Sequence, residues 1–237
     1  MLSDFWKLMV EQGWALALLR GAAVTILIGM LGMLTGFLVA APLAVLRWRK
    51  VLIISQLIDT YTVVIRGVPG LLVIYLLFFG SLDSVRAVAG AFGYQAAAEN
   101  VFPLIVGVIA IAVISCAYSI EVMRGALQAV PYGLLEAARS LALPGKVTFF
   151  RITFPLALRL ALGGINNVWQ MTIKDTSLIS VIGLQELMRT AAIAAGITRS
   201  SLLFYGIAAA MFFCMTIISQ MAFSRAEHAL NRGFGGR

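Results

Sequence analysis

Charged residues are scarce in this chain of 237 residues. Asp, Glu, Lys and Arg together make up 12% of it, whereas 61% is apolar, and the mean hydropathy is +0.98. A soluble domain is usually about half apolar and about a quarter charged. Folding this chain in water would leave a large apolar surface exposed, so the composition excludes a soluble globular domain and indicates an integral membrane protein.

Cysteine and histidine are almost absent. Cys116 and Cys214 both lie within apolar stretches, where they are expected to be small core residues rather than a disulfide framework. The single histidine, His228, lies near the C-terminus. One histidine excludes a zinc site of the H-E-x-x-H kind and argues against a Ser-His hydrolase.

No phosphate-binding loop of the G-x-x-x-x-G-K-[ST] kind is present. Gly145 and Lys146 are followed by Val147, and Ser140 stands at the position of the first glycine. If the protein uses ATP, another chain must bind the nucleotide.

Long apolar runs predict the fold. A helix needs about 20 apolar residues to cross a hydrocarbon core about 30 Å thick. Five runs meet this length approximately: 21–46, 51–80, 102–120, 155–183 and 201–223. We therefore expect an all-α membrane protein that forms one domain with five transmembrane helices, the second one tilted or bent because its run is long. Residues 1–20 mix charged and aromatic side chains, which predicts a short interfacial segment.

The distribution of Lys and Arg predicts the orientation. With five spans the two sets of loops lie on opposite sides, and one set contains eleven basic residues against five in the other. Cytoplasmic loops are enriched in Lys and Arg, so we expect the N-terminus in the periplasm and the C-terminus in the cytoplasm. The net charge of +8 is explained by these basic loops, and no nucleic-acid partner is needed.

A short amphipathic helix is expected in the longest polar interval. Pro131 suits a helix start, and Pro144 with Gly145 suits its end. Leu134 and Leu135 contribute to one apolar face. On these residues alone the segment could be an interfacial helix that rests on lipid.

The same segment resembles the EAA loop of ABC-importer permeases. The family pattern is E-A-A, three residues, Gly, nine residues, then I-x-L-P. It is matched here by Glu136, Ala137, Ala138, Ile152 and Pro155. Ala142 stands where glycine is usual, and alanine disfavours positive φ, so we expect the turn after the helix to differ.

Further stretches are similar to the polar amino acid permeases. They are residues 61–69 (YTVVIRGVP), 117–126 (AYSIEVMRGA) and 174–183 (KDTSLISVIG), and residues 167–170 and 188–192 resemble the histidine and opine branch. The similarity covers roughly residues 20–230. It implies a permease with the type I ABC-importer fold in the bacterial inner membrane, carrying a basic amino acid or an opine.

The resemblance also implies partners and a site of coupling. The partners would be a second permease, related rather than identical, two ATPase subunits that bind ATP and Mg²⁺, and a periplasmic substrate-binding protein. This chain would carry no cofactor and catalyse no covalent chemistry. The coupling loop, about 125–155, would dock on an ATPase through Gly133, Glu136, Ala137, Ala138 and Ala142.

Polar side chains follow one face of the fourth span. At 100° per residue they fall within about 140° of arc, although Ile173 and Val181 interrupt the face. The members are Asn166, Asn167, Gln170, Lys174, Ser177 and Ser180. Because polar groups are costly against lipid, the face is expected to line the translocation path or to hydrogen-bond a partner helix. Asp175 could meet a cationic substrate or a basic residue on a neighbouring helix.

Arg66 and Glu121 are ionisable groups within or beside spans. Arg66 could be a gate or a site for a substrate carboxylate, or it could form an ion pair with Asp59 or Glu121. Glycines 29, 32 and 36 recur in the first span and favour close helix packing.

Two other classes of function compete with this reading. An ion-driven secondary transporter would usually show internal repeats and more spans, and no convincing repeat is present. A purely structural subunit of a membrane complex would not need both a coupling-type loop and a polar stripe.

Overall fold

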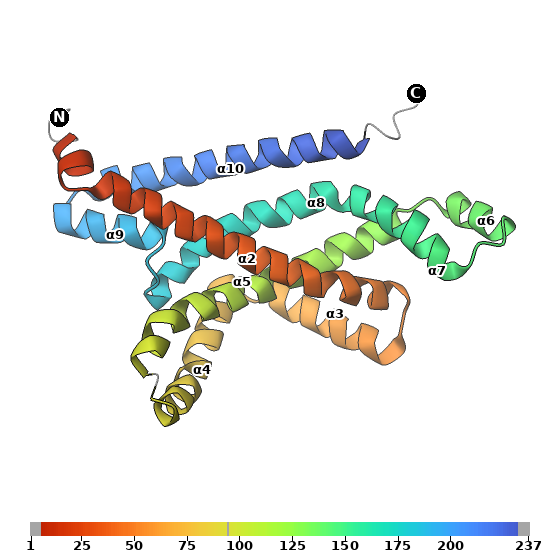
Figure 1. Cartoon of the computed structure of the whole chain (residues 1–237), viewed down its shortest axis with the longest axis horizontal. Helices are drawn as coiled ribbons and strands as arrows, with labels where there is room; N and C mark the ends of the chain where they lie inside the picture. The colour runs from red at the N-terminus through yellow and green to blue at the C-terminus, as the bar shows by residue number, and fades with distance from the viewer. Residues whose placement is uncertain (1–5, 94, 232–237) are drawn as a thin grey trace.

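The computed structural model describes residues 6–93 and 95–231, and the described residues are almost entirely helical (Figure 1). The elements, in chain order, are η1 (Lys7–Glu11), α2 (Trp14–Trp48), α3 (Leu52–Gly67), α4 (Gly70–Ala91), α5 (Gln95–Gln128), α6 (Tyr132–Ser140), α7 (Gly145–Thr148), η2 (Phe149–Thr153), α8 (Phe154–Asp175), η3 (Thr176–Ile182), α9 (Leu187–Thr198) and α10 (Ser201–Asn231). No strand occurs among these described residues.

Five helical stretches are long and apolar enough to cross a membrane. They are Trp14–Trp48, Gly70–Val88, Val101–Gln128, Gly145–Ile182 and Ser201–Ala229. The all-α class and the number of five spans are therefore confirmed within the described chain.

The second span differs from its prediction. The run 51–80 is not one bent helix but two helices, because α3 ends at Gly67 and α4 begins at Gly70. Pro69 disfavours the helical conformation of the residue before it, and Val68 is accordingly extended at φ −97° and ψ 138°. The spanning helix is α4, and α3 is a separate helix of 16 residues.

The start of the first span also differs. Helix α2 begins at Trp14 rather than near residue 21, so most of the predicted interfacial segment is η1 and the first turns of α2. The first five residues of that segment, together with Arg232 and Arg237 of the charge count, lie outside the described residues.

Helix α5 is the centre of the bundle. It packs against α2, α3, α4 and α8, and its residues Ile120, Met123 and Leu127 are buried in the core. In lipid there is no hydrophobic drive between helices, so close van der Waals contact must hold them together.

Glycines 32 and 36 provide that contact between α2 and α5. A Cβ at Gly36 would overlap Ser115 Oγ and lie 2.6 Å from the carbonyl oxygen of Ala112, whereas one at Gly32 would lie 2.5 Å from Ile111 Cγ2. The packing role predicted for these glycines is confirmed.

The two ends of the bundle carry different elements (Figure 1). Helices α6 and α7 project at one end, on the side towards which α10 leads to the C-terminus. The N-terminus and α9 lie at the opposite end, where α9 packs on α2 and α10.

The glycine contact makes a testable prediction about packing. Gly36→Ala should lower the stability of the protein by about 1–3 kcal/mol, because the new methyl group meets backbone atoms that cannot move aside. Gly125→Ala is the matched control, since it lies in α5 with open space around its Cβ position, and it should be neutral or stabilising by up to about 1 kcal/mol. Thermal unfolding in detergent measures both. Equal midpoints for the two variants would contradict the close contact.

Candidate functional site

Helix α6 presents most of the predicted coupling residues to the outside. Gly133, Glu136 and Ala137 are exposed, as is Ala142 just beyond the helix. Ala138 is only 2% exposed and packs within its own chain. A partner can therefore reach Glu136 and Ala137 directly, while Ala138 lies on the inner side of α6.

The turn after α6 has the geometry that glycine usually provides. Ala142 has φ +52°, its amide bonds the carbonyl of Arg139 at 2.9 Å, and the amide of Leu143 bonds the carbonyl of Ala138 at 3.1 Å. These are the two bonds of a Schellman motif. The expectation of a different turn is therefore wrong: the alanine takes the left-handed conformation, and the two backbone hydrogen bonds help to hold it there.

The loop is anchored to the core behind α6. Phe149 of η2 is buried in the same cluster as Leu127 and Val130 at the end of α5. Its ring lies 6.2 Å from that of Trp48 at the end of α2. The loop is therefore packed against the ends of both α2 and α5.

A charge cluster joins three helices near the α3 end of the bundle. Its members are Arg47, Asp59, Arg66, Glu121 and Arg124. Arg47 of α2 pairs with both Asp59 and Glu121. Arg124 Nη2 lies 3.0 Å from Glu121 Oε2. Glu121 thus neutralises several guanidinium groups. This pairing lowers the free-energy cost of placing charged side chains next to lipid.

Arg66 belongs to this cluster. Its Nη1 lies 3.6 Å from Glu121 Oε1, and its guanidinium lies over the ring of Tyr118 at 5.5 Å from the centroid. Of the two ion-pair partners expected for Arg66, the structure shows Glu121 and not Asp59. Arg66 remains 43% exposed, so its outer side is still open to a further contact.

The polar face of the fourth span is divided at the end of α8. Asn166, Asn167 and Gln170 lie in the α-helix, and Ser177 lies in the 3₁₀ segment η3. Gln170 Nε2 donates to Asn166 Oδ1 at 3.3 Å and to the carbonyl of Thr216 in α10 at 3.5 Å. One of these polar groups therefore already serves a helix–helix contact.

Other polar atoms of α8 are not satisfied. Trp169 Nε1 and Gln170 Oε1 are buried and have no hydrogen-bond partner among the described residues. Such atoms are costly unless a ligand, water or another chain meets them. Lys174 and Ser177 line a cavity of about 320 Å³ with Tyr205 of α10, and Asp175 is half-buried beside Lys174.

Glu186 was missed in the sequence. It is fully buried, and its carboxylate accepts from the amides of Met188 at 2.9 Å and Arg189 at 2.7 Å and from Thr25 of α2 at 3.1 Å. Burial raises the pKa of this carboxyl, and these hydrogen bonds offset part of the rise. Glutamate is not among the residues that usually cap a helix, so the sequence offered no N-cap signal at this position.

The five spans, the protruding α6 and the polar face of α8 define a membrane permease of the type I ABC-importer fold. Residues 32–226 match the family described as binding-protein-dependent transport system inner membrane component. The chain belongs to this family and is accordingly a multi-pass protein of the inner membrane.

Curated relatives align over almost the full length. The chain is 41% identical over 224 residues to the nopaline transport system permease protein NocQ of Agrobacterium fabrum, covering 94% of each chain. It is 30% identical over 207 residues to the histidine/lysine/arginine/ornithine transport system permease protein HisQ of Salmonella typhimurium, covering 87% of this chain and 90% of that one.

Solved structures agree with the fold. A crystal structure of an amino acid ABC transporter with histidines superposes with a TM-score of 0.79 at 27% identity, over 93% of this chain and 97% of that one. The methionine ABC transporter MetNI in an inward-facing conformation superposes with a TM-score of 0.70 at 15% identity, over 90% and 96% of the two chains, which supports the fold alone.

The left-handed conformation of Ala142 predicts that glycine has opposite effects on helix stability at two positions of this loop. Ala142→Gly should stabilise the end of α6 by about 1 kcal/mol, because glycine adopts positive φ without a Cβ penalty. Ala137→Gly, inside the same helix, should destabilise it by about 1 kcal/mol. Amide hydrogen exchange of α6 should therefore slow in the first variant and accelerate in the second. The same direction in both would show that residue 142 is not left-handed.

The charge cluster makes a second prediction. Glu121→Gln should lower stability by about 2–3 kcal/mol, because it leaves guanidinium groups without a counter-charge. Arg66→Gln should cost less than about 1 kcal/mol, since that pair is longer and more exposed. Thermal midpoints in detergent give the order, and substrate uptake is measured beside them. Loss of uptake in Arg66→Gln at an unchanged thermal midpoint would indicate that Arg66 acts in transport and not only in the ion-pair cluster.

Proposed function

We propose that this chain is a transmembrane permease subunit of an ATP-driven importer for polar, and in particular basic, amino acids or opines. The observation that carries the proposal is the exposed helix α6, held on an anchored loop at one end of a five-span bundle. A permease without a nucleotide site needs such a surface to receive work from an ATPase.

The coupling surface would consist of Gly133, Glu136, Ala137 and the turn at Ala142. Small residues allow a partner surface to approach closely, and Glu136 can accept a charge-assisted hydrogen bond from a basic residue of the ATPase. Ala138 would act from the buried side, by fixing α6 on its own loop.

The translocation path would be lined by α8. The members assigned to it are Asn166, Asn167, Gln170, Lys174, Asp175 and Ser177, with Arg66 and Glu121 acting chiefly through the charge cluster. The two buried and unpartnered atoms, Trp169 Nε1 and Gln170 Oε1, support a polar ligand or partner chain at this face.

The cargo follows from chemistry and from relatives. Relatives are described as transporting nopaline, octopine, arginine, or histidine with lysine, arginine and ornithine. These share an amino acid group and a second nitrogen-containing polar group. We assign the same class of cargo to this chain.

The assembly would contain a second, related permease, two ATPase subunits that bind ATP and Mg²⁺, and a periplasmic substrate-binding protein. The N-terminus would lie in the periplasm and α6 in the cytoplasm, in one permease domain over residues 1–237. Closure of the ATPase dimer on ATP would rotate the spanning helices through α6 and open the cavity to the opposite side, and hydrolysis would reset it.

The coupling role is tested by Glu136→Lys in the reconstituted complex. ATPase activity is measured in proteoliposomes with the binding protein and a panel of arginine, histidine, lysine, ornithine, octopine and nopaline. We expect stimulation by one loaded binding protein in the wild type and a loss of at least about tenfold in the variant, because a lysine repels the basic partner of Glu136.

Glu227→Lys is the control, since it makes the same change of charge at an exposed site of α10, outside the coupling loop, and should preserve stimulation. Size-exclusion chromatography checks that both variants still assemble with the ATPase. Uptake that follows an ion gradient, with no ATPase co-purifying, would contradict the proposal.

A further inference from the structure

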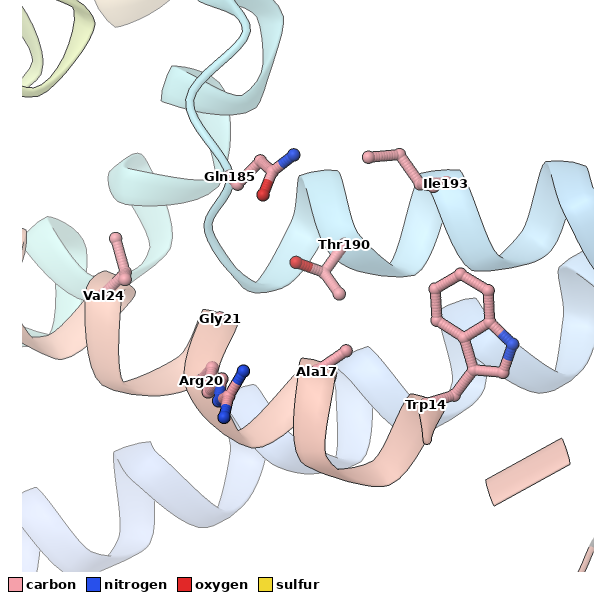
Figure 2. Close-up of a pocket in the computed structure, with 8 residues that line it drawn as sticks. All are labelled: Trp14, Ala17, Arg20, Gly21, Val24, Gln185, Thr190 and Ile193. Atoms are coloured by element: carbon pink, nitrogen blue, oxygen red, sulfur yellow. The ribbon is translucent and has the colours of Figure 1, made fainter. Parts of the chain in front are cut away.

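A pocket lies between the first turns of α2 and helix α9, at the end of the bundle opposite α6 (Figure 2). Its volume is about 380 Å³, within the range of small-molecule sites. Trp14, Arg20 and Val24 line it from α2, and Thr190 and Ile193 line it from α9.

Among the described residues that line this pocket, Arg20 alone is charged. Its guanidinium makes no ion pair or hydrogen bond with residues 6–93 or 95–231. The amide side chain of Gln185 lines the pocket from the segment before α9, across from α2. Five donors in a planar fork, with no acceptor among the described residues, suit an anion with several oxygens, such as a phosphate.

Apart from Gln185 and Thr190, the other residues that line the pocket beside Arg20 are aromatic, aliphatic or glycine. The position of Arg20 along α2 indicates which kind of phosphate it could meet. Arg20 and Arg47 are 27 residues apart on one continuous helix, which is about 40 Å at 1.5 Å per residue. A bilayer measures about 40–45 Å with its headgroups and about 30 Å without them. When Arg47 lies at one headgroup layer, Arg20 therefore lies at the other.

Neighbouring residues fit the same level. Trp14 lines the pocket one to two turns from Arg20 towards the helix start, and tryptophan is enriched at the headgroup level. Leu16, Leu19 and Ile26 of α2 are exposed, so lipid chains can lie beside this part of the helix. Val24 and Ile193 contribute apolar side chains to the pocket.

We propose that this pocket binds one glycerophospholipid, with the phosphate on Arg20 and the upper part of an acyl chain against Val24 and Ile193. The lipid would fill the gap between α2 and α9 and hold the two helices together at that end of the bundle. This inference does not depend on the cargo or on the coupling role of α6.

Native mass spectrometry of the purified complex in neutral detergent tests the proposal. The complex is titrated with dioleoyl phosphatidylglycerol, and bound lipids are counted. Arg20→Gln should weaken retention of one lipid about tenfold, because it removes the charge-assisted hydrogen bonds to phosphate. Arg20→Lys should weaken it less. Arg86→Gln, which removes an exposed charge of α4 outside the pocket, should bind as the wild type does.

Two further arms separate the possible ligands. Dioleoylglycerol, which lacks the phosphate, should not be retained, and inorganic phosphate at the lipid concentration should not displace the lipid. Ala17→Phe fills the pocket without changing charge and should also expel the lipid, so it decides the matter if Arg20→Gln fails to assemble. Unchanged retention in Arg20→Gln or in Ala17→Phe, an equal loss in Arg86→Gln, or displacement by inorganic phosphate would overturn the proposal.

Discussion

The close approach of α2 to α5 is the contact on which the rest of the bundle depends. At glycines 32 and 36 the two helices meet backbone to side chain, with no room for a methyl group. Helix α5 then supplies the surfaces on which α3, α4 and α8 pack. Because neighbouring helices in lipid gain little from burying apolar area, this steric fit has to fix their register. The packing that brings Arg47 of α2 to Glu121 of α5 follows from the same register.

The charge cluster and the loop that carries α6 both connect the ends of α2 and α5. The ends of α2 and α5 are joined by ion pairs through Arg47 and by aromatic packing through Phe149. A force applied to the loop behind α6 would therefore act on the helix pair at the centre of the bundle. Helix α8 packs on the same central helix, so the helix with the polar face and the loop behind α6 both contact α5.

The overall fold could be predicted from the sequence because apolar runs of membrane length are nearly independent of tertiary context. The break at Pro69 was missed because the run continues in hydropathy on both sides, and only the backbone restriction before proline interrupts it. The partner of Arg66 could not be chosen between Asp59 and Glu121, since that choice depends on how α3 and α5 pack. The left-handed Ala142 could not be predicted either, because the backbone hydrogen bonds of the helix cap and the anchoring of the loop override the preference of alanine for negative φ.

The separation of α3 from α4 has a consequence for biosynthesis. The chain emerges from the ribosome N-terminal end first, and α3 contains both an acidic and a basic partner of the charge cluster. Asp59 can be neutralised by Arg47 as soon as the α2–α3 hairpin exists, but the counter-charge of Arg66 is 55 residues further along the chain, at Glu121. Arg66 therefore gains its counter-charge only after α5 has been inserted. The order of synthesis is also the order in which these charges are balanced.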